Sequence, residues 1–94
     1  MTRPLRIAQV APVGTAVPPQ RSGSIETMTS VLTEGLVARG HHVTLFATAD
    51  STTGATLHAT FARGYREDPR VWPWELCELL NMSAAFERAR PWDR

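Results

Sequence analysis

The apolar positions in the first half of the chain follow a strand, helix, strand pattern. Residues 6–11 form an apolar run interrupted by Gln9, which is typical of a parallel strand covered on both faces. Residues 25–39 carry apolar side chains at spacings of three and four, which predicts an amphipathic helix. Residues 42–48 are rich in β-branched and aromatic side chains, which predicts a second strand. This order predicts a β-α-β unit with parallel strands.

The boundaries of the first helix are indicated by its end residues. Ser22 or Ser24 can cap its start, and Glu26 lies in the first turn, where a carboxylate is favoured. Gly40 suits the left-handed position after the last turn. Gly35 is unfavourable inside a helix by about 1 kcal/mol relative to alanine, and we expect a close approach of helix and sheet to offset that cost. The apolar face consists of Ile25, Met28, Val31, Leu32, Leu36 and Val37.

The second half predicts a short third strand and a second helix. The strand is expected at residues 57–61, after a polar loop, and the helix at residues 73–89, between Pro73 and Pro91. Proline is tolerated at the first helical position because its missing N–H has no intrahelical partner there. The expected apolar side of this helix comprises Leu76, Leu79, Leu80, Phe86 and Ala89, with Cys77 and Met82 at its flanks.

These elements predict an α/β fold: an incomplete Rossmann-like parallel sheet with flanking helices. A doubly wound sheet normally has five or six strands, and this chain offers at most three. We therefore expect residues 1–94 to form part of a larger protein. The alternative is a complete small domain that closes its sheet edge by pairing with a partner.

Composition narrows the function classes. The net charge of the 94 residues is +1, which argues against a nucleic-acid partner. The single cysteine, Cys77, excludes an internal disulfide and is consistent with the cytoplasm. No signal peptide and no membrane-spanning segment is recognised in the sequence. Peripheral membrane contact stays open.

The common nucleotide-binding motifs do not occur. Gly14 stands alone after the first strand, so the dinucleotide-binding G-x-G-x-x-G is missing, and a P-loop requires a lysine that the chain lacks. His41 and His42 are neighbours on a strand and point to opposite faces, so we expect structural histidines and no metal. No G-x-S-x-G nucleophile motif occurs. There remains the turn at Gly23 and Ser24, where the helix N-terminus can hold an anion such as a phosphate.

Several stretches, taken in order, resemble the start of the family-4 glycosyltransferases, which are retaining enzymes of the GT-B fold. Their N-termini run R-I-A-x-V-x-P, a proline-bearing loop, G-G-x-E, an amphipathic helix, L-x-x-R-G-H-x-V-T-L-F-A and a polar D-S turn. The matching stretches here are residues 6–12, Pro18–Pro19, residues 23–26, residues 36–47, Asp50–Ser51 and, before the family's next strand, residues 86–89.

The resemblance implies the N-terminal half of a GT-B acceptor domain. The implied parent is a hexosyltransferase-type enzyme that transfers a sugar from a nucleotide-diphosphate sugar to an acceptor, without an essential metal or other cofactor. By position, Gly23, Ser24 and Glu26 match the loop that approaches the donor diphosphate and the acceptor, with Ser24 in place of the family's second glycine. The resemblance places no catalytic residue in this chain and implies a donor-binding C-terminal domain outside it. We expect the chain alone to be inactive.

Two alternatives remain beside this interpretation. The first is a non-catalytic half-Rossmann module that docks on a partner chain, or on a copy of itself, through the open edge of its sheet. The second is half of a sugar-nucleotide epimerase, which we rank last because the glycine fingerprint is missing.

Overall fold

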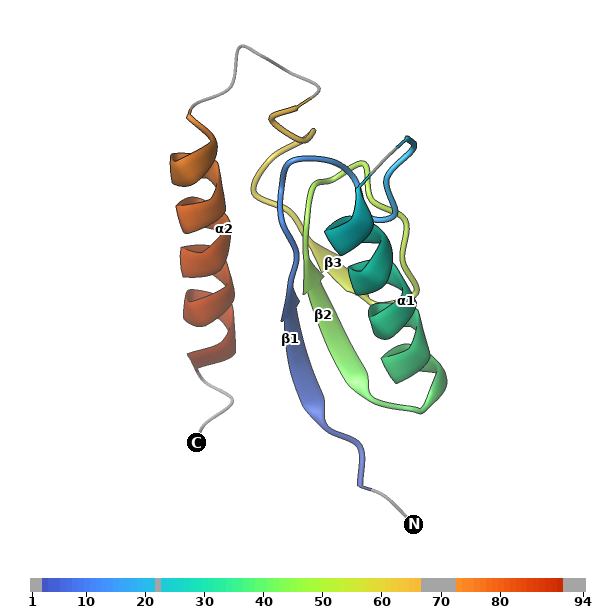
Figure 1. The fold of residues 1–94 in the computed structure, drawn as a ribbon. Coiled ribbons are helices and arrows are strands. Elements are labelled where there is room, and N and C mark those ends of the chain that lie inside the picture. The colour runs from blue at the N-terminus through green and yellow to red at the C-terminus, as the bar shows by residue number, and fades with distance from the viewer. Residues whose placement is uncertain (1–2, 22, 67–72, 91–94) are drawn as a thin grey trace.

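A parallel, open sheet between two helices makes up the described part of the chain. The computed structural model describes residues 3–21, 23–66 and 73–90. Its elements are β1 (Arg6–Val10), α1 (Ser24–Ala38), β2 (His42–Phe46), β3 (Thr56–His58) and α2 (Trp74–Ala89), and the strand order is β1-β2-β3 (Figure 1). The α/β class is therefore confirmed, and the sheet is compatible with an incomplete Rossmann-like fragment.

Both strand pairs are parallel, as the β-α-β pattern predicts. Ile7 lies opposite Val43 in the first pair, and Leu45 lies opposite Leu57 in the second. The second strand ends at Phe46, earlier than predicted, and the Thr48 hydroxyl donates to the Asp50 carboxylate in the turn that follows. The third strand is shorter than predicted and begins one residue earlier.

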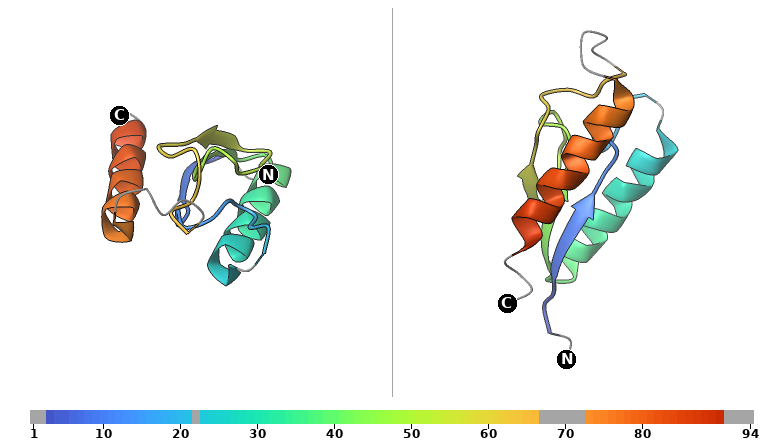
Figure 2. Two further views of the ribbon diagram at one scale, coloured as in Figure 1. Left: turned by 90° about the horizontal axis from the view of Figure 1, so that it is seen from above. Right: turned by 90° about the vertical axis from the view of Figure 1, so that its left-hand side faces the viewer.

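The two helices cover opposite faces of the sheet. Seen from above, the sheet lies between α2 on one side and α1 on the other (Figure 2). In the described residues β1 pairs only with β2, so its second edge is unpaired. The open edge of β1 thus lies between the two helices.

The core forms around the carboxyl ends of β1 and β2. Leu45 and Ala47 pack there with Ala11 and with Val17 of the loop that follows β1. Ala55 and Leu57 are half-buried against this cluster. The loop after β1 therefore contributes to the core, because burial of its apolar side chains against the sheet is favourable.

Most of the apolar face predicted for α1 is not covered by the sheet. Glu26 and Thr33 are the buried residues of this helix, and Leu36 and Val37 are half-buried. The side chains predicted to be buried but found exposed are Ile25, Met28, Val31 and Leu32. The predicted close approach at Gly35 is also wrong, since a methyl group there would meet no atom within 4 Å.

The second helix shows the same inversion. Its buried residues are Cys77, Asn81 and Ala85, whereas Leu76, Leu79, Met82 and Phe86 are exposed. Periodicity shows which side chains share a face, but the sheet decides which face is covered. Neither helix of the described chain has the length and apolar character needed to cross a bilayer.

Candidate functional site

The start of α1 offers free backbone donors at the carboxyl end of the sheet. The first intrahelical bond runs from Thr27 N to the Gly23 carbonyl oxygen at 2.9 Å. Gly23 is the N-cap residue, and no side chain of the described residues caps the helix. Ser24 is therefore the first helical residue and not a cap, and Ser22 lies outside the described residues. The N–H groups of the first turn have no intrahelical acceptor and can meet a ligand.

Gly23 lies directly against the side chains of Glu26 and Pro19. A Cβ atom at this position would lie 2.8 Å from Glu26 Oε1 and 3.2 Å from Pro19 Cγ. A side chain there would displace the Glu26 carboxylate. The structure thus joins two of the predicted site residues, Gly23 and Glu26, in one contact.

Glu26 is the most unusual of the predicted residues. Only 3% of it is exposed, and within the described residues its carboxylate has no hydrogen-bond or ion-pair partner. The positive end of the α1 dipole favours a carboxylate in the first turn. An ionised carboxylate only accepts hydrogen bonds, so Glu26 suits a hydroxyl donor better than a phosphate.

Ser24 lies on a different surface from Glu26. It is exposed and lines a shallow hollow of about 380 Å³ between α1 and β1. The other lining residues are Gln9, Ile25, Met28, Thr29 and Leu32. The apolar lining does not suit a charged ligand, so the predicted role of Ser24 in donor binding stays a prediction without support from its surroundings.

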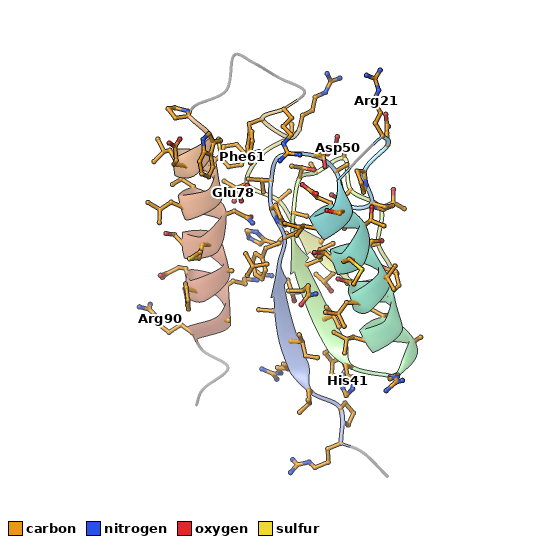
Figure 3. The ribbon with its side chains drawn as sticks, viewed as in Figure 1. Arg21, His41, Asp50, Phe61, Glu78 and Arg90 are labelled. Carbon is orange, nitrogen blue, oxygen red and sulfur yellow. The ribbon has the colours of Figure 1, made fainter. Side chains whose placement is uncertain are left out.

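The loop between β1 and α1 is held by a carboxylate from α2. Glu78 accepts one bifurcated hydrogen bond from Val13 N, at 3.2 Å to Oε1 and 3.1 Å to Oε2, and its Oε2 also accepts the Tyr65 hydroxyl hydrogen at 3.0 Å. The side chain extends from α2 toward this loop (Figure 3). The sequence analysis did not predict Glu78 or Tyr65. An acidic residue among the apolar residues of a helix could have indicated a buried hydrogen-bond acceptor.

Asn81 ties the same helix to both long strands. Its Nδ2 donates to the carbonyl oxygens of Ala11 at 2.9 Å and Phe46 at 3.2 Å, and the side chain is buried. These carbonyls lie just beyond the end of β1 and at the end of β2. Asn81 therefore fixes the point where both strands turn into the loops of the candidate site.

The loop after β2 supports the loop after β1. Val17 N donates to Ser51 Oγ at 2.9 Å, and Thr52 N donates to the Val17 carbonyl at 2.9 Å. The Asp50–Ser51 pair, part of the resemblance, thus has a structural role here. Asp50 and Arg21 are exposed at the same end of the molecule (Figure 3).

Burial shifts the pKa of two groups near these loops. Burial, followed by the hydrogen bond to Glu78 and its charge, raises the pKa of the Tyr65 hydroxyl. Burial and then the Glu78 charge raise the pKa of the Cys77 thiol, which keeps it protonated at neutral pH and unsuited as a nucleophile. The interpretation of Cys77 as a buried apolar residue agrees with its 1% exposure.

The histidines have structural surroundings. Leu5 N donates to His41 Nδ1 at 3.1 Å, and the His58 ring lies 5.2 Å from the Phe46 ring. In the part of the chain that the structure describes, no three His, Cys, Asp or Glu side chains are grouped so as to hold a metal ion.

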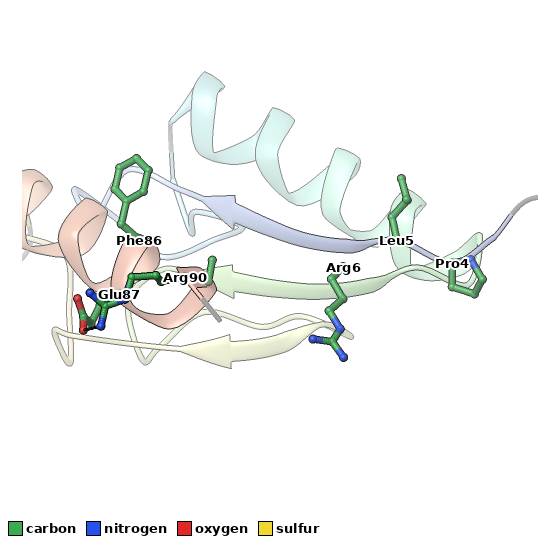
Figure 4. A pocket seen from close by; sticks show the side chains of 7 residues that line it. Pro4, Leu5, Arg6, Phe86, Glu87 and Arg90 are labelled. Carbon is green, nitrogen blue, oxygen red and sulfur yellow. Dashed lines mark hydrogen bonds and ion pairs between the residues drawn. The ribbon is translucent and has the colours of Figure 1, made fainter. Parts of the chain in front are cut away.

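A hollow of about 680 Å³ lies at the opposite end of β1 (Figure 4). Its lining comes from the start of β1 and the end of α2: Pro4, Leu5, Arg6, Phe86, Glu87, Ala89 and Arg90. It is remote in the fold from the α1 N-terminus, which adjoins the other end of β1, so it does not extend the predicted site.

No protein-family model matches this chain, and no curated protein matches it either. The features that indicate a function are therefore the geometry at the start of α1 and the motif resemblance.

Proposed function

We propose that this chain is the N-terminal, acceptor-side part of a glycosyltransferase that transfers a sugar from a nucleotide-diphosphate sugar. The observation that carries the proposal is the contact between Gly23 and Glu26 at the start of α1, which no side chain of the described residues caps. Free N–H groups there suit a diphosphate oxygen, and the buried carboxylate suits a sugar hydroxyl. The proposed setting is the cytoplasm, where nucleotide sugars serve as donors.

The chain alone is expected to bind weakly and not to turn over. A transferase needs donor and acceptor held in one closed cleft that excludes water, and the described residues supply only one wall of such a cleft. A glycosyl-transfer assay of the 94-residue chain should therefore give no product above a protein-free control.

Binding can be tested without turnover. We suggest titrating the ¹⁵N-labelled chain separately with uridine- and guanosine-diphosphate sugars while following backbone amide shifts. Shifts concentrated at residues 23–26 are expected, because these amides precede the first intrahelical bond and would donate to the ligand. Gly23→Ala should weaken binding and reduce them, because the added methyl group would shift the Glu26 carboxylate that is proposed to accept a sugar hydroxyl.

Gly35→Ala is the matched control, since a methyl group at that exposed position meets nothing. It should leave the shifts unchanged. Absence of any shift at millimolar ligand, or shifts spread evenly over the chain, would contradict the proposal. Reading the coding sequence beyond Arg94 adds an independent check, because a second Rossmann-like domain is expected there.

A second candidate function is a binding module that docks through its open sheet edge. The observation in its favour is the exposure of apolar residues on both helices beside β1, among them Met28 at 69% and Phe86 at 72%. Exposed apolar patches of this kind often mark interaction sites. This function requires no ligand at Gly23.

A further inference from the structure

The open edge of β1 presents unused backbone groups in a fixed pattern. Leu5 O accepts from His42 N at 2.8 Å, and Ala11 N donates to Phe46 O at 3.0 Å. In a parallel ladder the residues of a strand point their N–H and C=O groups alternately to one neighbour and the other. Ile7 and Gln9 therefore bond to β2, and the groups of Arg6, Ala8 and Val10 point to the open edge.

This edge carries few of the features that protect an exposed strand. β1 contains no proline and no lysine, and its single charged residue, Arg6, stands at its first position. Pairing centred on Ala8 is self-complementary in the antiparallel sense. Ala8 would exchange both hydrogen bonds with the partner's Ala8, and Arg6 would do so with the partner's Val10.

Apolar hollows flank the edge on both faces of the sheet. On the α1 face, Gln9 of β1 lies beside Ile25, Met28 and Leu32. On the α2 face the hollow of about 360 Å³ is lined by Ala8, Val10, Met82, Ala85, Phe86 and Ala89. A strand added to β1 would therefore be covered by apolar side chains on both of its faces.

The outer stripe of α2 is self-complementary as well. Its members, at spacings of three and four, are Glu75, Leu79, Met82, Phe86 and, directly after the last helical residue, Arg90, which also forms an ion pair with Glu87 of its own helix at 3.2 Å. The stripe begins with an acid, ends with a base, and has exposed apolar side chains between them. In an antiparallel pair of such helices, Glu75 meets the partner's Arg90 and Leu79 meets the partner's Phe86.

The exposed apolar area is comparable with that of a standard dimer interface. The large apolar side chains that contribute to it are between 45% and 72% exposed. The exposed side chains along this edge are Leu5, Val10, Ile25, Met28, Leu32, Leu79, Met82 and Phe86. At partial burial they offer roughly 800 Å², which is the area per partner of a standard interface.

We propose that the open edge of β1, with the apolar faces of α1 and α2 beside it, binds a second copy of this chain antiparallel across a two-fold axis. A two-fold interface requires a surface that complements itself. The β1 edge about Ala8 and the α2 stripe about Met82 both meet that requirement, and these two residues share one hollow. Binding of a strand from a different protein would not require either surface to complement itself. This inference rests on the second candidate function, docking through the open sheet edge, because in the proposed transferase a further strand of the same protein would pair with the edge of β1.

The test uses the 94-residue chain and measures its molar mass by sedimentation equilibrium between about 1 and 200 µM. We expect a concentration-dependent dimer of twice 10.4 kDa. Ala8→Pro removes an N–H that points outward and spares the ladder to β2. It should weaken dimerisation at least tenfold. Ala59→Pro is the matched control, because Ala59 is exposed after β3, at the other edge of the sheet, and it should have no effect.

Two charge variants test the antiparallel arrangement. Glu75→Arg and Arg90→Glu should each weaken the dimer, because each places like charges at both helix contacts. An equimolar mixture of the two variants should restore it as a heterodimer, since both contacts then pair opposite charges. Far-UV circular dichroism verifies that each variant is folded.

Three results would overturn the proposal. The first is a folded monomer at every concentration. The second is an oligomer that Ala8→Pro leaves intact in a folded variant, or charge variants that fail to rescue one another. The third is a monomer that gains mass only when another polypeptide is added, which would assign the edge to a foreign strand.

Discussion

Tyr65 donates its hydroxyl hydrogen to Glu78 at 3.0 Å, and this bond joins the segment after β3 to α2. The same carboxylate accepts Val13 N, so one side chain holds two loops at the carboxyl end of the sheet. Burial and the neighbouring carboxylate both favour the neutral phenol, which is why the pKa of Tyr65 is raised.

The raised pKa makes stability depend on pH in the alkaline range. The folded chain holds the phenolic proton more tightly than the unfolded chain, in which the tyrosine pKa is about 10. The stabilisation is therefore complete below that pH and is lost as pH rises through the folded pKa. Absorbance near 295 nm reports this titration directly, because Tyr65 is the only tyrosine.

We expect the midpoint of the Tyr65 titration to lie at a higher pH in the native chain than in the chain unfolded in guanidinium. A native midpoint at or below the denatured one would contradict the Tyr65–Glu78 contact. Cys77 acts in the same direction, since its pKa is also raised. Tyr65→Phe isolates the phenol: the variant should lose less stability than the parent chain between pH 9 and 11.

The elements of this fold could be predicted from sequence because each depends on local patterns. The β-α-β unit and its parallel pairing follow from the runs at residues 6–11 and 42–48. The covered helix faces could not be predicted, because the apolar stripe of α1 is exposed while Glu26 and Thr33 are buried. Which face of each helix is buried depends on where the sheet packs against it, and that contact is not encoded in the local pattern of the helix.

The candidate site was predicted only where it is local in sequence. Gly23, Ser24 and Glu26 lie within one turn of chain, and the structure joins Gly23 to Glu26. Glu78 and Asn81 form hydrogen bonds with backbone groups that lie 65 and 70 residues away in sequence. Their spacing within α2 indicates a shared face, but nothing in the sequence identifies the carbonyl and N–H groups that they bind.

Asn81→Asp should destabilise the chain at neutral pH. The new carboxylate would face the carbonyl oxygens of Ala11 and Phe46, to which Nδ2 now donates. A buried charge without a partner costs about 3 kcal/mol. The expected loss in the free energy of unfolding, measured in urea at pH 7, is of that size.

The loss should shrink as pH falls toward 4, because the folded variant takes up a proton and the neutral acid can donate to a carbonyl again. The quantity to compare at each pH is the difference between variant and parent, which removes the titration of other groups. A difference that stays constant with pH would show that Asn81 is not buried against these carbonyls.

Gly64→Ala should destabilise the chain through a backbone clash. The added methyl group would fall on the Gly14 carbonyl group and near Thr15 Cα, and neither can move without shifting the loop after β1. Overpacking of this kind costs about 1–3 kcal/mol. Gly35→Ala is the matched substitution at an exposed helical position and should stabilise by about 1 kcal/mol. Chemical unfolding of both variants should give opposite signs, and equal signs would contradict the loop contact.

Thr33→Val should stabilise the chain. Thr33 is fully buried on the sheet side of α1, and its Oγ1 has no hydrogen-bond partner among the described residues. Burying a hydroxyl without a partner costs about 1–3 kcal/mol, and valine has nearly the same shape. We expect a gain of about 1 kcal/mol in the free energy of unfolding. Thr29→Val is the control, because the Thr29 hydroxyl is bonded to the Ile25 carbonyl at 2.8 Å and its removal should bring no gain. If Thr33→Val destabilised the chain instead, the Thr33 hydroxyl would have to bind a partner in solution, and the placement of α1 on the sheet would need revision.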